Sequence, residues 1–195
     1  MMNCLLCGVG GQGTVLASRV IAQTAMEAGL FARTAETIGM AQRGGCVVSH
    51  VRVGAGCQSA LIPLGQADVL IAFEPGEAVR CLPYLKPDGT VIVNPTAVQP
   101  VTAALTGGRE DGAAMVSYLK KKVRRVIVVD GAGVCAACGS PKVLNTALLG
   151  AAAASGALGL TVAETEKTLC ARLPEKVHAM NIRALHLGAA AAEKE

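Results

Sequence analysis

Three glycines near the start of the chain have the spacing of a loop that holds an anionic ligand. Gly8, Gly10 and Gly13 form a G-x-G-x-x-G pattern within the stretch GVGGQGT. An apolar run precedes the pattern and a helical run follows it, which is the strand–turn–helix context that the motif requires. Glycines let the chain turn sharply, and free amides at a helix start favour an anion. Thr14 would add a hydroxyl there.

An acidic residue extends this pattern toward a dinucleotide site. Such a site needs a carboxylate about 20 residues further on to hold a ribose, and Glu36 lies near that position. The pattern therefore allows a stand-alone reductase that binds a nicotinamide or flavin nucleotide. The same glycines are equally suited to a close crossing of the first strand and helix without a ligand.

A second glycine-rich segment, ETIGMAQRGG at residues 36–45, connects two predicted strands. Open α/β sheets place such connections at their ligand-binding edge. Arg43 precedes Gly44 and Gly45, so a guanidinium fork stands beside flexible amides that suit a carboxylate or a phosphate. An internal ion pair between Arg43 and Glu36 explains the same residues without a ligand, and both alternatives remain open.

His50 is the second candidate catalytic residue besides Arg43. The alternation of side chains along a strand places Val48, His50 and Arg52 on one face. A histidine can transfer a proton near neutral pH, although a lone histidine on a half-polar strand more often has a structural or surface role.

Eight cysteines form no regular disulfide framework, and no signal peptide is recognisable, so free thiols in the cytoplasm are expected. Cys4 and Cys7 fall in a predicted strand, where a spacing of three sends side chains to opposite faces. Cys135 and Cys138 share one face of a predicted helix, which allows thiol redox chemistry, although packing is the commoner role. No spacing resembles an iron–sulfur or other metal site, so none is predicted.

The composition limits the number of domains and the classes of function that the chain can have. The chain has 195 residues, 52% of them hydrophobic and 2% aromatic, which predicts a single domain over residues 1–195 with an aliphatic core. The net charge of +4 and one basic run at residues 120–125 do not form the wide basic face of a nucleic-acid-binding protein. Residues 143–163 carry no charge, but glycines and polar residues interrupt them, so we expect a buried helix and no membrane span.

Apolar runs alternate with helical patterns along the chain. Strands are expected at residues 3–9, 31–37, 46–53, 69–73, 90–94 and 126–129, and helices at 15–28, 76–85, 112–123 and 142–154. Residues 56–62 would add a hairpin partner to the strand at 46–53. The fold class is therefore α/β, a Rossmann-like, mostly parallel sheet flanked by helices.

A helical segment is expected to close the chain over about residues 161–195. Thr161 is a plausible N-cap for one helix, and Pro174 would open the last. This tail could serve as an arm that packs on a neighbouring molecule, and its apolar helices allow a homodimer of the isolated chain.

Several stretches together resemble the gamma subunit or domain of 2-oxoacid:ferredoxin oxidoreductases. They are GVGGQGT, GMAQRGG, VSHVR, ADVLIAFEPGEAVR and PDGTVIVNP, with LNTALLGA and NIRALHLG towards the end. Within that family, a separate chain of this length is most similar to the small (beta) subunit of indolepyruvate:ferredoxin oxidoreductase. Gamma subunits of the pyruvate and ketoisovalerate enzymes are the near alternatives.

The resemblance implies a reaction and also which subunit carries the cofactors. The reaction is oxidative decarboxylation of a 2-oxoacid, here indolepyruvate or another aryl pyruvate, with coenzyme A to acyl-CoA and reduction of ferredoxin. Thiamine diphosphate, Mg²⁺ and iron–sulfur clusters would be carried by a large catalytic partner subunit, because the Gly-Asp-Gly motif for thiamine diphosphate is missing here. Ferredoxin would be reached through the complex, and the isolated chain would be inactive and bind no cofactor.

The resemblance also implies a Rossmann-like shape without tightly bound NAD. We expect the two glycine-rich loops to meet at one sheet edge and to close over the partner's active-site entrance, where Arg43 would steady an anionic group. The residues expected near cofactor or substrate are Gly8, Gly10, Gly11, Gln12, Gly13, Thr14, Glu36, Gly39, Met40, Gln42, Arg43, Gly44 and Gly45.

Overall fold

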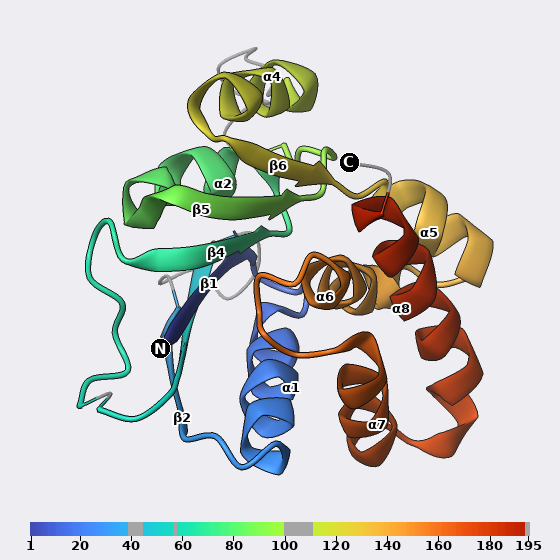
Figure 1. Cartoon of the computed structure of the whole chain (residues 1–195). Coiled ribbons are helices and arrows are strands. Elements are labelled where there is room, and N and C mark those ends of the chain that lie inside the picture. Colours follow the sequence, from blue (N-terminus) through green and yellow to red (C-terminus); the bar gives the residue numbers. More distant parts are fainter. Residues whose placement is uncertain (39–44, 57, 100–110, 194–195) are drawn as a thin grey trace.

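The computed structural model describes the chain except for residues 39–44, 57, 100–110 and 194–195 (Figure 1). Its strands form one sheet in the order β2-β3-β1-β4-β5-β6. The bounds are β1 (Met2–Val9), β2 (Ala32–Ile38), β3 (Cys46–Val53), β4 (Ala67–Ala72), β5 (Leu85–Val93) and β6 (Arg125–Val128).

The sheet is mixed but mostly parallel, which confirms the expected α/β class. Strands β1, β4, β5 and β6 run parallel to one another, whereas β3 runs antiparallel to both of its neighbours, β1 and β2. The insertion of β3 moves β2 one strand further from β1 than a dinucleotide-binding sheet would have it.

Helices cover both faces of this sheet. Helices α1, α6, α7 and α8 lie on one face, α2 and α4 lie on the other, and α5 follows the end of β6 (Figure 1). Their bounds are α1 (Thr14–Glu27), α2 (Pro75–Cys81), α4 (Gly112–Lys122), α5 (Gly131–Cys138), α6 (Leu144–Ala154), α7 (Val162–Arg172) and α8 (His178–Ala192).

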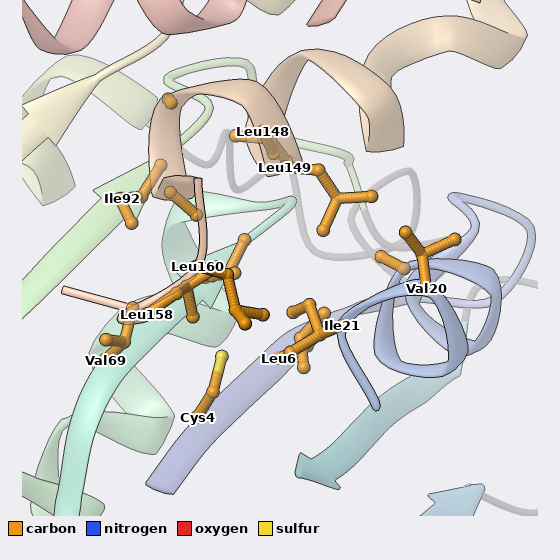
Figure 2. Close-up of a cluster of buried hydrophobic side chains, with 14 of the residues drawn as sticks. Cys4, Leu6, Val20, Ile21, Val69, Ile92, Leu148, Leu149, Leu158 and Leu160 are labelled. Atoms are coloured by element: carbon orange, nitrogen blue, oxygen red, sulfur yellow. The ribbon is translucent and has the colours of Figure 1, made fainter. Parts of the chain in front are cut away.

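The core consists of aliphatic side chains on both faces of the sheet. Figure 2 shows one of the two clusters, in which Leu6, Val69 and Ile92 of the strands meet residues of α1 and α6. The second cluster lies under α2 and α4 and includes Leu5 and Cys7. Because neighbouring strand residues point to opposite faces, Cys4 and Cys7 belong to different clusters, as predicted.

The predicted hairpin partner at residues 56–62 is wrong. Strand β3 is already paired on both edges, with β1 and with β2, so neither edge can accept another strand. The described part of this segment approaches the side chains of β3 instead. There the backbone N–H of Ile62 donates to Nδ1 of His50 (3.1 Å), and the guanidinium of Arg52 donates to the carbonyl of Ser59 (3.0 Å).

Two helix boundaries also differ from the prediction. The helix expected at 76–85 ends at Cys81 and gives way to a 3₁₀ turn, Leu82–Tyr84, with Pro83 inside it, and β5 then begins at Leu85. The helix expected from Lys142 begins at Leu144, after the 3₁₀ turn Pro141–Val143. Proline suits the first residues of a turn but supplies no backbone donor, which accounts for these short irregular segments.

The C-terminal helices are not an arm. A Cβ on Gly150 of α6 would lie 1.9 Å from the carbonyl oxygen of Leu185, and a Cβ on Gly188 of α8 would lie 1.8 Å from that of Ala147. These two glycines therefore let the backbones of α6 and α8 touch, so the tail packs on its own molecule. Thr161 forms the predicted cap of α7 as a full capping box with Glu164.

The uncharged stretch that includes α6 is buried, as predicted, since its residues 145–153 are covered by the sheet and the neighbouring helices. Among the described residues, none of the helices combines the length and the apolar character that crossing a bilayer requires.

Candidate functional site

The structure brings the ends of the two glycine-rich loops together. We call the edge where β1, β4, β5 and β6 end the carboxyl edge. The antiparallel pairing sets Val9, the last residue of β1, opposite Cys46, the first residue of β3. Just beyond this pair, the backbone N–H of Gly10 donates to the carbonyl oxygen of Gly45 (2.9 Å). The rest of the second loop, with Gly39, Met40, Gln42, Arg43 and Gly44, lies outside the described residues.

Gln12 fills the space between the ends of β1 and β4. Its Oε1 accepts a hydrogen bond from the backbone N–H of Val9 (2.8 Å), and its Nε2 donates to the carbonyl of Phe73 (3.3 Å). Gly8 makes room for this side chain, because a Cβ there would lie 2.6 Å from Oε1 of Gln12. Gly11 and Gly13 have φ values of 97° and 89°, which a residue with a side chain rarely adopts.

This arrangement is unfavourable for a dinucleotide. The chain leaves β1 and β4 towards opposite faces of the sheet, and such a switch point is where a dinucleotide crosses the edge. Gln12 occupies that place. Glu36, the expected ribose ligand, lies on β2, about 5 Å further from β1 because β3 intervenes. Its carboxylate lies 3.8 Å from Nε of Arg19 in α1.

Asn145 is a polar residue at this edge that sequence reasoning missed. It is the second residue of α6, and its Nδ2 would lie 2.8 Å from a Cβ on Gly13. No local pattern distinguishes Asn145 from the uncharged stretch around it, and only the packing of α6 on α1 brings it to Gly13.

His50 lies away from the described ends of the two loops. It pairs with Leu5 in the middle of β1, four residues along β3 from Cys46, which is roughly 13 Å at the usual strand rise. The side chain is 4% exposed and contacts the ring of Tyr84 edge-on, with centroids 5.9 Å apart. Burial lowers the pKa of His50, and its Nδ1 accepts the hydrogen bond from Ile62, so the ring is neutral with its proton on Nε2.

A cluster of thiols surrounds a buried carboxylate beneath α2, and the sequence did not indicate it. Glu77 is 2% exposed and pairs with Arg80 one turn later. Burial and the hydrogen bond to Glu77 raise the pKa of the Cys46 thiol to about 12, so it stays protonated at neutral pH. Burial likewise raises the pKa of Cys7, whose thiol is hydrogen-bonded to Cys81. The same hydrogen bond lowers the pKa of Cys81. The raised pKa values of Cys46 and Cys7 make these two thiols packing and donor groups rather than nucleophiles.

Cys135 and Cys138 lie in α5 as predicted. The Cys135 thiol donates to the carbonyl of Pro141 (3.7 Å), and burial raises its pKa, which works against thiolate chemistry. In the portion of the chain that the structure covers, no three His, Cys, Asp or Glu side chains are placed to hold a metal ion. The described residues therefore do not fit an iron–sulfur cluster or a magnesium ion.

Comparison with known proteins identifies the family. The model of the family described as pyruvate ferredoxin/flavodoxin oxidoreductase matches residues 3–191. The chain belongs to this family. It is 37% identical to indolepyruvate oxidoreductase subunit IorB of Archaeoglobus fulgidus over 189 residues, which are 96% of this chain and 93% of that protein. This oxidoreductase chain is thus of the gamma type, and its assignment as a subunit of a 2-oxoacid:ferredoxin oxidoreductase is confirmed.

Solved structures share the fold of this oxidoreductase chain. The gamma subunit of a keto/oxoacid ferredoxin oxidoreductase from Geobacter sulfurreducens superposes with a TM-score of 0.74 at 22% identity, and 100% of each chain is covered. A 2-oxoglutarate:ferredoxin oxidoreductase from Magnetococcus marinus, solved with 2-oxoglutarate, coenzyme A and succinyl-CoA, gives 0.74 at 19% identity. Here 100% of this chain matches 31% of that longer one, so the same fold also occurs as part of a larger polypeptide.

Proposed function

We propose that this chain is the small subunit of an indolepyruvate-type 2-oxoacid:ferredoxin oxidoreductase and that its carboxyl edge shapes the active-site entrance of the complex. The bond between Gly10 and Gly45 supports the proposal, since it joins the described ends of the two glycine-rich loops at that edge. The near full-length similarity to subunit IorB supports the substrate class, indolepyruvate or another aryl pyruvate.

In this proposal the large partner subunit carries the cofactors. Thiamine diphosphate with Mg²⁺ would supply the decarboxylation chemistry there, iron–sulfur clusters would pass electrons to ferredoxin, and coenzyme A would be the co-substrate. The present chain would contribute a closed backbone surface that excludes water from the entrance. Gln12 keeps that surface rigid, because its amide is bonded to both strands that end beneath it.

Reconstitution tests the assignment. The isolated chain should show no oxidoreductase activity with an aryl pyruvate, coenzyme A and ferredoxin, and activity should appear when the large subunit is added and should co-purify with a stoichiometric complex. A large subunit that is fully active without this chain, or an isolated chain that oxidises substrate by itself, contradicts the proposal.

Arg43 is proposed to steady an anionic group of the substrate or of coenzyme A in that complex. Arg43→Ala should lower kcat/KM about tenfold or more without loss of assembly, because one hydrogen bond to a charged group contributes roughly 1.5–3 kcal/mol. Arg172→Ala, at the exposed end of α7, is the control and should leave kinetics unchanged. Unchanged substrate and coenzyme A constants in Arg43→Ala would remove the residue from the mechanism, and loss of assembly alone would make its role structural.

A further inference from the structure

The N-terminus of α1 has no cap. Its N-cap residue is Gly13, which has no side chain to accept a hydrogen bond, and the first turn carries no acidic residue. The carbonyl of Gly13 accepts from Ala17, but the amides of residues 14–16 have no acceptor among the described residues. An α-helix of 14 residues therefore presents unsatisfied donors and the positive end of its dipole at the carboxyl edge.

Asn145 adds a donor at the same place. Its Oδ1 accepts from the backbone N–H of Thr146 (2.9 Å). This bond fixes the orientation of the amide, so it is Nδ2 that faces Gly13. The side chain is 6% exposed, and in the described part of the chain Nδ2 has no acceptor. Nδ2 keeps some access to solvent, so a group that enters from solvent can accept a hydrogen bond from it.

Thr14 supplies a third kind of donor. The residue is 3% exposed, and its methyl group packs near Gly8, where a Cβ would lie 3.3 Å from Cγ2. Within the described residues its hydroxyl has no hydrogen-bond partner. Thr24, ten residues later in the same helix, has its hydroxyl bonded to the carbonyl of Val20 (2.8 Å) and illustrates the ordinary arrangement.

We propose that this donor cluster, formed by the amides of residues 14–16, the Thr14 hydroxyl and the Asn145 amide, binds an oxyanion, the phosphoryl or carboxylate group of a small ligand. Every contributing group is a donor, and an oxyanion accepts several hydrogen bonds at a helix N-terminus. The ligand reaches the cluster past Gly11 and Gly13, which are exposed and half-exposed. The Gln12 side chain is hydrogen-bonded to Val9 and Phe73 rather than to the amides of residues 14–16, so it leaves these donors to an oxyanion while it obstructs a dinucleotide that would span the edge.

Anion titration of the isolated full-length chain tests this site without the partner subunit. Sodium phosphate and sodium acetate are added separately at constant ionic strength, and backbone amide shifts of residues 14–16 are followed by ¹⁵N NMR. Saturable shifts are expected, and a tighter response to phosphate or to acetate identifies the phosphoryl or the carboxylate group. Shifts that match those of sodium chloride would overturn the proposal.

Variants make the test specific. Asn145→Ala and Thr14→Val should each weaken binding about tenfold or more, as expected for a lost hydrogen bond to a charged acceptor. Thr24→Val makes the same change in the same helix and should bind as the unmodified chain does. Asn145→Asp keeps the acceptor for Thr146 while it replaces Nδ2 with a carboxylate oxygen, and it should abolish binding in a folded protein. Undiminished binding in Asn145→Asp would contradict the proposal, and reconstituted activity would still decide the proposed function independently.

Discussion

At the residue scale, His50 shows how burial decides what a titratable side chain can do. The ring accepts a hydrogen bond from Ile62 and is covered by Tyr84, and its lowered pKa follows from desolvation. The sequence correctly predicted which side chains share a face of β3, because the alternation of side chains along a strand is a local property. The cover on His50 was not predictable, since it comes from a loop that was expected to be a strand.

The His50 pKa has a consequence for stability against acid. An unfolded histidine titrates near about 6.5 and the folded one lower, so the unfolded state binds more protons as pH falls below that value. The stability that neutral His50 contributes is complete above about pH 6.5 and is lost as pH falls through the lowered pKa. His50→Asn retains an acceptor for Ile62 but does not titrate. Between pH 7.5 and 5.5 the unmodified chain should lose about 1 kcal/mol more stability than this variant, measured by urea unfolding. Equal losses would show that folding does not lower the pKa of His50.

At the element scale, local sequence signals predicted the positions of most helices and strands, but they did not predict the order of the strands in the sheet. Thr161 predicted the start of α7, because a cap depends on residues within one turn. The position of β3 between β1 and β2 depends on hydrogen bonds between strands that are distant in sequence, and no local pattern encodes it. The wrong hairpin at residues 56–62 has the same origin, since both edges of β3 were already used.

The contact between α6 and α8 gives an element-scale prediction. Propensity alone favours Gly188→Ala by up to about 1 kcal/mol, since alanine is the better helix former. The added methyl would meet the Ala147 carbonyl at 1.8 Å, so the backbones must separate. We expect Gly188→Ala to lower the free energy of unfolding by about 2 kcal/mol or more, measured by urea denaturation. A gain in stability would show that the two helices are not in backbone contact.

At the scale of the whole molecule, the fold argues against dinucleotide binding, which is one of the roles that the opening glycines allow. The G-x-G-x-x-G pattern correctly marked a strand, a turn and a helix at the carboxyl edge. Whether the pattern binds a dinucleotide could not be predicted from the sequence. Gln12 fills the switch point, β3 separates Glu36 from β1, and Asn145 of α6 lies beside Gly13. Each of these is a tertiary contact.

Nucleotide addition tests that conclusion. NAD, NADP and FMN at millimolar concentration should leave the thermal unfolding midpoint of the isolated chain unchanged within about 1 °C, because a ligand that does not bind the native state gives no stabilisation. Binding at 100 times the dissociation constant would instead contribute about 2.7 kcal/mol and raise the midpoint by several degrees. Such a rise would restore the stand-alone reductase as the better function.

The bond between Thr146 and Asn181 joins α6 to α8. The Thr146 hydroxyl donates to Oδ1 of Asn181 (2.8 Å), so α8 fastens the helix that sets Asn145 beside Gly13. The glycine turn precedes α8 in the chain, so the ribosome makes it earlier. The carboxyl edge therefore lacks this support until α8 has been made and has packed on α6, and a chain that stops before α8 would never gain it.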